Sequence, residues 1–184
     1  GVCRTQVTLH VGAGTFKPVQ EADARAHEMH TESLFVHREA IEALMDETRR
    51  NVAVGTTSVR TIESLYWLGV KLLANKEKAP VALEQWESYE LPQHITQKEA
   101  LEALLAYLHR EQLEYLEATT RLMIVPGYQF RMTDEMLTNF HLPQSTLLLL
   151  VAAFIGEDWR RVYAYALEQE FRFLSYGDSS LLIP

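Results

Sequence analysis

The spacing of apolar and polar residues predicts alternating strands and helices in the first part of the chain. Val7, Leu9 and Val11 lie on one face of an expected strand, because successive side chains of a strand point to opposite faces. The expected elements are strands over residues 5–11 and 28–36, a helix over 38–50, a strand over 51–54 and a helix that begins at Val59. This order is typical of an α/β fold in which strands pair in parallel.

Helices dominate the pattern in the second part of the chain. Thr96 and Glu99 have the spacing of a capping box, so a helix is expected to begin there and to continue to about Glu117. The other expected elements are a loop-like region over 71–93, strands over 122–125 and 138–142, a helix from Ser145 to Gly156, a helix over 158–169 and a loop at 177–178.

Composition places the chain among globular proteins. Its 184 residues, of which 47% are hydrophobic, are enough for one domain with a core of its own. No apolar run approaches the roughly 20 residues that a membrane-spanning helix needs, and no signal peptide is visible. A single cysteine, Cys3, excludes an internal disulfide framework. We therefore expect a cytoplasmic protein that does not associate with membranes.

The charge of the chain does not favour a nucleic acid as its partner. The formal net charge is −8, whereas proteins that bind polyphosphate chains gain affinity from clustered Lys and Arg residues. Positive residues occur only in small groups, namely Arg49 with Arg50, Lys76 with Lys78, and Arg160 with Arg161. Charge alone therefore gives no basic footprint for tRNA.

A glycine-containing cluster, His10 to Thr15, follows the first expected strand. Gly12 and Gly14 would let the backbone approach a ligand closely, and consecutive N–H groups there would form an anion-binding nest. A tight turn after the strand is the alternative explanation.

A second cluster, Gly55-Thr-Thr-Ser58, joins an expected strand to an expected helix. The free N–H groups at the start of a helix suit a carboxylate or a phosphate. Ordinary N-capping by Thr57 or Ser58 explains the same residues equally well. The lysine of a Walker loop is missing, so a nucleotide-binding P-loop is excluded.

A third cluster is the motif H-E-M-H-T-E over residues 27–32. A metal site is disfavoured, because residues 27 and 30 point to opposite faces of a strand. His30 and Glu32 share a face and are better suited to form a hydrogen-bonded acid/base pair.

The fourth cluster, Thr138 to Pro143, precedes a helix that is too apolar to lie on the surface. Asn139 and His141 are therefore expected to be partly buried and to need polar partners. Two interpretations of His141 remain open: a core histidine with a structural hydrogen bond, and a histidine with a pKa near neutral that transfers protons.

Together these motifs resemble one family. The motifs are V-T-L-H-V-G-A-G-T-F (7–16), H-E-M-H-T-E (27–32), A-V-G-T-T-S-V-R-T-I-E-S (53–64), P-G-Y-Q-F (126–130), T-N-F-H-L-P-Q-S-T-L-L (138–148) and F-R-F-L-S-Y-G-D (171–178). Their order is that of the bacterial S-adenosylmethionine:tRNA ribosyltransferase-isomerases, and they cover almost all of the chain except residues 71–119.

The resemblance implies a fold. It implies a single α/β domain over residues 1–184, with a barrel-like, mostly parallel sheet surrounded by helices. The barrel would be incomplete, because the chain resembles only the C-terminal portion of the family protein and the N-terminal part contributes further strands. Residues 71–119 would be an expanded loop-plus-helix segment. Unpaired strand edges would then favour self-association of the chain or local disorder near its N-terminus.

The resemblance also implies an activity. Family members transfer and isomerise the ribosyl moiety of S-adenosylmethionine onto 7-aminomethyl-7-deazaguanine in tRNA, which gives epoxyqueuosine and releases adenine and methionine. S-adenosylmethionine would be the ribosyl donor, and no metal is implied. Two alternatives remain: a divergent paralogue that acts on another acceptor, and a non-catalytic binding module with the same fold.

Residue roles follow from the resemblance as hypotheses. Proton transfer is assigned to His141, or to His30 with Glu32, and Asn139 joins this catalytic set. The residues expected to bind S-adenosylmethionine are His10, Gly12, Gly14, Thr15, Gly55, Thr56, Thr57, Ser58 and Asp178, the last through the ribose hydroxyls.

Three positions depart from the family pattern. Ser33 and Leu34 replace an aromatic pair, and Gln144 replaces a residue that is commonly basic. The loss of an aromatic ring and of a positive charge would weaken stacking on a base and contact with phosphate.

Overall fold

The structure, a computed structural model, describes residues 1–12, 27–74, 79 and 82–184. Strands and helices are interspersed along the chain, so the α/β class is confirmed. The described strands form two separate sheets, one with the order β1-β2-β5-β4 and one with the order β3-β6-β7.

The four-stranded sheet is built mainly around β2. It comprises β1 (Thr8–His10), β2 (Glu32–His37), β4 (Ala82–Leu83) and β5 (Tyr115–Thr120). β1 and β5 pair with β2 in antiparallel fashion, whereas β4 pairs with β5 in parallel. Leu34 and Val36 point into the core from β2, and Leu116 and Ala118 do so from β5.

The position of β5 corrects a prediction. The helix expected to reach about Glu117 ends at Arg110, and the next residues turn the chain, with Gln112 in the left-handed region at φ 57°. The strand expected over 122–125 is not formed, and Tyr115–Thr120 is the strand instead. Alternation of buried and exposed side chains in Y-L-E-A-T-T is the strand signal that the strong capping box obscured.

The three-stranded sheet comprises β3 (Val52–Val54), β6 (Glu135–Asn139) and β7 (Ser179–Leu182). β3 is parallel to β6, and β7 is antiparallel to it. One face carries buried side chains such as Ala53, Met136 and Leu182. The opposite face is left largely open to solvent.

The expected mostly parallel sheet is wrong. Of the five described pairings, three are antiparallel and two are parallel, and the described strands form two open sheets rather than a closed barrel. The order of elements along the chain predicted parallel neighbours. The strands actually pair with partners that are distant in sequence, as β2 does with β5.

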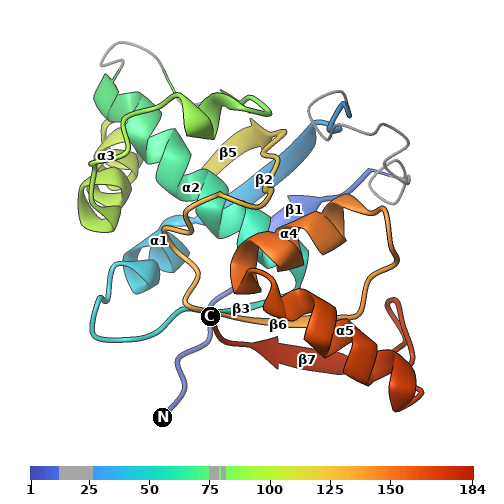
Figure 1. Ribbon diagram of the computed structural model, residues 1–184. Coiled ribbons are helices and arrows are strands. Elements are labelled where there is room, and N and C mark those ends of the chain that lie inside the picture. The colour runs from blue at the N-terminus through green and yellow to red at the C-terminus, as the bar shows by residue number, and fades with distance from the viewer. Residues whose placement is uncertain (13–26, 75–78, 80–81) are drawn as a thin grey trace.

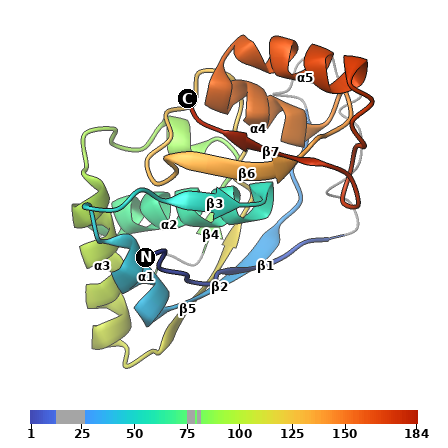
Figure 2. The same cartoon turned by 90° about the horizontal axis from the view of Figure 1, so that it is seen from below.

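The helix α2 (Thr56–Ala74) is the centre of the fold. It lies between the two sheets and packs against strands of both (Figures 1 and 2). Its side chains are buried on nearly every side, among them Leu65, Tyr66 and Trp67, as expected of a helix surrounded by other elements. The helix begins three residues before the predicted Val59 and runs into the region expected to be a loop.

The helix α3 (Gln97–Arg110) packs across α2 at a close contact. A Cβ atom placed on Gly69 would lie 2.1 Å from the carbonyl oxygen of Ala100, so only glycine allows this approach. The predicted capping box is confirmed: Thr96 Oγ1 accepts from the N–H of Glu99, and Glu99 Oε2 accepts from the N–H of Thr96. Residues 71–119 therefore contribute buried elements to the core.

The remaining helices are α1 (Arg38–Leu44), the 3-10 helix η2 (Glu87–Tyr89), α4 (Thr146–Ile155) and α5 (Asp158–Glu168). α4 and α5 pack together beside the three-stranded sheet (Figure 1). The predicted cap of α4 is confirmed, because Ser145 Oγ accepts from the N–H of Leu148. Among the described helices, none combines the length and apolarity required to cross a membrane.

Candidate functional site

Two of the four polar clusters and the F-R-F-L-S-Y-G-D motif meet at one edge of the three-stranded sheet. Gly55 follows β3 and Asn139 ends β6, and these parallel strands end at the same edge. β7 begins there, with Ser179 opposite Asn139, so Asp178 lies at this edge as well. The N–H of Gly55 donates to the carbonyl oxygen of Leu137 at 2.8 Å. The topology thus brings together motifs that are separated by more than a hundred residues of sequence.

The start of α2 links this edge to the H-E-M-H-T-E motif. Arg60, in the second turn of α2, donates through Nη1 to the carboxylate of Glu32 at the start of β2, and also through Nε to the carbonyl oxygen of Leu122 at 3.3 Å. Arg60 and Glu32 are 3% and 1% exposed, so the ion pair is shielded from water. Sequence reasoning assigned no role to Arg60.

The start of α2 has the geometry of an anion site. Gly55 has φ 89°, and its carbonyl oxygen accepts the N–H of Val59, so Gly55 is the residue that precedes the helix. Capping by Thr57 or Ser58 is wrong, because both lie inside the helix, and Ser58 Oγ donates to the carbonyl oxygen of Val54 at 2.7 Å. Thr56 is buried. The first N–H groups of a helix have no partner within the helix, and with the positive end of the helix dipole they can attract a carboxylate.

His141 is a buried, uncharged histidine. Its Nε2 is 3.1 Å from Thr138 Oγ1, and its backbone N–H donates to the hydroxyl of Tyr163 at 3.0 Å. Burial lowers the pKa of His141 from 6.5 to about 4, so the imidazole is neutral at pH 7. This environment favours the structural interpretation of His141 over a pKa near neutral.

Asn139 and Asp178 hold the loop that precedes β7. Asn139 Nδ2 donates to the carbonyl oxygen of Asp178 at 3.3 Å and to Ser179 Oγ at 3.2 Å. Asp178 accepts from the backbone N–H and the guanidinium of Arg172, and these hydrogen bonds lower the pKa of Asp178. Gly177 packs on the backbone, since a Cβ there would lie 2.2 Å from the carbonyl oxygen of Arg172.

The predicted pair of His30 and Glu32 is not joined by a hydrogen bond in the described part of the chain. Glu32 instead pairs with Arg60, and His30 lies half-buried just before β2. Residues 27–31 precede β2 and are not in a strand, so the opposite-face argument against a shared metal site does not apply to them. Among the described residues, no group of three or more His, Cys, Asp or Glu side chains is arranged to hold a metal ion.

The first cluster is only partly described. His10 is exposed at the end of β1, opposite Ser33, with its ring 5.2 Å from the ring of Phe35. Gly12 is also exposed. Gly14 and Thr15 lie outside the described residues.

The family departures fall in different environments. Leu34 is fully buried, so its side chain packs in the core and is not available to stack on a base. Ser33 is partly exposed, and Gln144 is exposed between β6 and α4. Only Ser33 and Gln144 therefore bear on contacts with a ligand.

Glu63 is a second buried charge that sequence reasoning missed. Its carboxylate accepts from the backbone N–H groups of Arg131, Met132 and Thr133 and from the hydroxyls of Tyr128 and Thr133. Burial raises the pKa of Glu63, while these hydrogen bonds oppose the shift. Glu63 thereby ties the P-G-Y-Q-F loop to α2. An acidic residue next to the long apolar run of this helix was the available signal.

Two cavities lie away from the predicted site. One, of about 670 Å³, is lined by Arg4, Thr5, Gln6, His37, Glu39 and Ala40. The other, of about 220 Å³, lies between α5 and the end of β7. Neither is lined by a residue of the predicted site.

Comparison with known proteins is consistent across sequence and structure. Curated relatives named S-adenosylmethionine:tRNA ribosyltransferase-isomerase include one from Polynucleobacter asymbioticus, 38% identical over 99% of this chain and 40% of its own length, and one from Ruegeria sp., 40% identical over 100% of this chain and 42% of its own length. The crystal structure of S-adenosylmethionine tRNA ribosyltransferase from Thermotoga maritima matches with a TM-score of 0.57 and 30% identity, over 97% of this chain and 44% of that one.

These matches show how much of its relatives the chain covers and to which family it belongs. It spans about 40% of the length of the curated relatives that it matches. The profile of the queuosine biosynthesis protein family covers residues 1–182, and therefore every motif described above. The chain belongs to the queuosine biosynthesis protein family.

Proposed function

We propose that the protein carrying this chain transfers and isomerises the ribosyl moiety of S-adenosylmethionine onto 7-aminomethyl-7-deazaguanine in tRNA. The products are epoxyqueuosine in tRNA, adenine and methionine. The observation that carries the proposal is the family match over residues 1–182, joined to relatives that bear this enzyme's name at 38% and 40% identity. S-adenosylmethionine acts as a substrate, and the proposal requires no metal.

The reaction places three demands on the site. A base must remove a proton from the carbon beside the sulfonium, whose positive charge acidifies that C–H bond. Donors must stabilise adenine as it leaves, and a positive pocket must hold the methionine carboxylate. The motifs converge around the start of α2, which supports a single site that meets all three demands.

The methionine carboxylate is assigned to the start of α2. The Thr56–Ser58 segment there offers backbone N–H groups, and the hydroxyl of Thr57 adds a donor. Gly55 has a left-handed backbone, in which a side chain would be strained. Glycine at this position therefore places no side chain in front of the N–H groups. His10, Gly12, Gly14 and Thr15 are assigned to the same ligand from the side of β1.

His30 is assigned as the proton acceptor, with Glu32 and Arg60 as its supporting ion pair. The low pKa of His141, about 4, makes that imidazole a weak base at pH 7. His141 is better suited to hydrogen-bond the leaving adenine in its neutral form, next to Asn139. Asp178, whose side chain is 37% exposed, retains acceptor capacity beyond its bonds to Arg172 and is assigned to a ribose hydroxyl.

Release of adenine tests the proposal. Full-length protein carrying this sequence is incubated with S-adenosylmethionine, with and without tRNA that contains 7-aminomethyl-7-deazaguanine. We expect adenine release that depends on the modified tRNA. Release that is indifferent to this tRNA but requires another acceptor would identify a paralogue of different specificity. Absence of release under all conditions would identify a non-catalytic module.

A further inference from the structure

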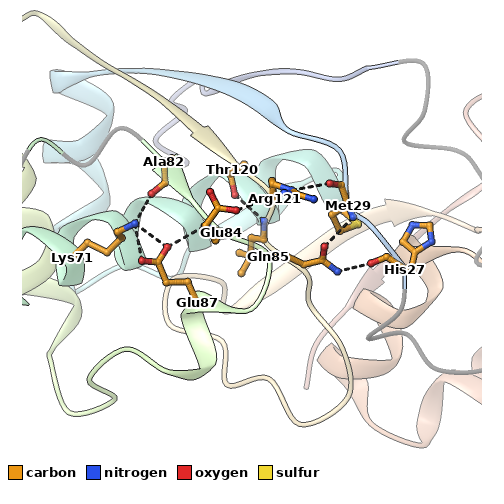
Figure 3. A network of polar contacts seen from close by, with 10 residues as sticks. His27, Met29, Lys71, Ala82, Glu84, Gln85, Glu87, Thr120 and Arg121 are labelled. Carbon is orange, nitrogen blue, oxygen red and sulfur yellow. Dashed lines mark hydrogen bonds and ion pairs between the residues drawn. The ribbon is translucent and has the colours of Figure 1, made fainter.

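The backbone before β2 is held by the side-chain amide of Gln85. Gln85 Oε1 accepts the N–H of Met29 at 3.0 Å, and Gln85 Nε2 donates to the carbonyl oxygen of His27 at 2.6 Å (Figure 3). A residue in a parallel ladder bonds the C=O and the N–H of two partner residues that are two positions apart. The buried amide of Gln85 therefore replaces a strand in pairing with residues 27–29.

Arg121, which follows β5, adds a further hydrogen bond to this backbone. We call Gln85 and Arg121 together the clamp. Arg121 Nε donates to the carbonyl oxygen of Met29 at 3.0 Å, and its guanidinium lies 3.7 Å from the carboxylate of Glu84. Its backbone N–H donates to the carbonyl oxygen of Leu83 at 2.9 Å, which extends the pairing of β4 with β5. Both polar groups of the Met29 backbone are thus bound by side chains, one by Gln85 and one by Arg121.

The clamp is itself anchored to the end of α2. Lys71 Nζ donates to the carbonyl oxygen of Ala82 at 2.7 Å and to the carboxylate of Glu87 at 2.8 Å, and that carboxylate accepts the N–H of Glu84 at 3.0 Å (Figure 3). The backbone of Gln85 is fixed as well, because its carbonyl oxygen accepts the N–H of Met123 at 3.2 Å. The position of Gln85 is therefore determined by contacts on both sides.

We propose that Gln85, supported by Arg121, is a positioning residue for the H-E-M-H-T-E motif. It fixes the backbone of residues 27–29, and the direction of the His30 side chain depends on that backbone. Misplacement of a catalytic group by about 1 Å is enough to slow an enzymatic reaction strongly. The inference rests on the proposed function, in which His30 accepts the proton, and it gives a role to the 71–119 segment, from which Gln85 comes.

The test compares two glutamines in full-length protein carrying this sequence. Gln85→Met removes both hydrogen bonds at nearly constant volume. Gln97→Met is the matched control, since Gln97 donates one hydrogen bond to the carbonyl oxygen of Leu44, far from the motif. We expect kcat/KM for adenine release to fall at least about tenfold in Gln85→Met, mainly through kcat, and to stay unchanged in Gln97→Met. Melting temperatures of the two variants show whether general destabilisation explains the difference.

Gln85→Glu tests whether kcat/KM follows the hydrogen bonds made by residue 85. General destabilisation would not produce a recovery at lower pH. The protonated carboxyl that Gln85→Glu introduces can donate to His27 and accept from Met29, as the amide does, whereas the carboxylate repels the carbonyl oxygen of His27. The kcat/KM of this variant relative to the unsubstituted protein should therefore rise as the pH falls from about 8 to about 5. The same ratio for Gln85→Met should stay flat.

Hydrogen exchange separates failure of the clamp from failure of the proposed function. The amide of Met29 should exchange at least about tenfold faster in Gln85→Met than in Gln97→Met, whether or not adenine is released. Unchanged exchange would overturn the clamp. Faster exchange with unchanged kcat/KM would overturn the positioning role. If the unsubstituted protein releases no adenine, the proposed function fails, and the positioning role for proton transfer fails with it, while the exchange data still decide the clamp.

Discussion

The guanidinium of Arg60 donates to the carboxylate of Glu32, and both side chains are almost completely buried. Burial lowers the pKa of Arg60, and the charge of Glu32 opposes that shift. Among the described residues, none forms a hydrogen bond with the buried Nη2 atom of Arg60, which adds to the cost of placing the arginine there. The pair connects the central helix to the strand that carries the third motif, so its integrity should matter for the whole site.

Removal of Arg60 alone should be strongly destabilising. Arg60→Met leaves the charge of Glu32 buried without the arginine, and the expected loss is about 3–5 kcal/mol in the free energy of unfolding. Arg60→Met combined with Glu32→Leu removes both charges and should cost less than Arg60→Met alone. Urea denaturation at pH 7 measures both. If the double variant were the less stable of the two, the ion pair would not be the reason for the burial of Arg60.

Stability should depend on pH through His141. The pKa of His141 is about 4 in the folded protein and about 6.5 when unfolded, so between these values the unfolded chain binds more protons. The stability contributed by neutral His141 is complete above about pH 6.5 and is lost as the pH falls towards 4, by about 3 kcal/mol in total. Unfolding free energies measured from pH 7 to pH 4 should therefore decrease.

His141→Gln is the control for this pH dependence, because glutamine does not titrate and its amide can still bond Thr138. The slope between pH 4 and pH 6.5 should become shallower in this variant by about one proton. An NMR titration gives the pKa of His141 directly. A value near 6.5 in the folded protein would contradict the buried, uncharged state.

Replacement of Glu63 by glutamine should destabilise the P-G-Y-Q-F loop. Both oxygens of Glu63 accept hydrogen bonds, so either orientation of the amide turns an NH₂ group towards a donor. We expect a loss of about 2–4 kcal/mol in the free energy of unfolding, from unsatisfied buried donors. Glu99→Gln, at the exposed capping box, should cost well under half as much. Equal losses would contradict the role of Glu63 as the anchor of the loop.

The chain by itself is predicted to self-associate through the open face of the three-stranded sheet. Val54, Leu137 and Leu181 lie in register across β3, β6 and β7, and their exposed fractions are 64%, 36% and 52%. Exposed apolar patches and unpaired strand edges favour association. Sedimentation velocity should show concentration-dependent association that Leu137→Lys weakens. Leu167→Lys, on the exposed side of α5, should have no effect, and a monomer at every concentration would rule the prediction out.

The sequence predicted the class and many local elements of the fold, but not the pairing of strands. Capping residues act over three or four positions, so Thr96 and Ser145 located the starts of α3 and α4 correctly. Strand pairing depends on contacts between distant segments. The antiparallel pairing of β2 with β5, for example, joins Leu34 to Ala118 and leaves no local signal.

The same distinction between local signals and contacts across the fold applies to the site. Strand-end clusters such as Gly55–Ser58 were identified from the sequence because a junction rich in glycine and hydroxyl residues is visible within a few consecutive positions. The partners of these clusters were not identified. Arg60, Glu63 and Gln85 acquire meaning only through contacts across the fold, with Glu32, Thr133 and Met29 respectively. The expectation that 71–119 stands apart from the motifs concealed Gln85 in particular.

The mass of the modified nucleoside in tRNA is the most direct test of the proposed activity. Transfer RNA containing 7-aminomethyl-7-deazaguanine is incubated with S-adenosylmethionine and full-length protein carrying this sequence, and is then digested to nucleosides for mass spectrometry. The proposal predicts conversion of the precursor to epoxyqueuosine, together with one adenine for each nucleoside converted. An unchanged precursor in the presence of folded protein, or a methylated product without adenine, would contradict it.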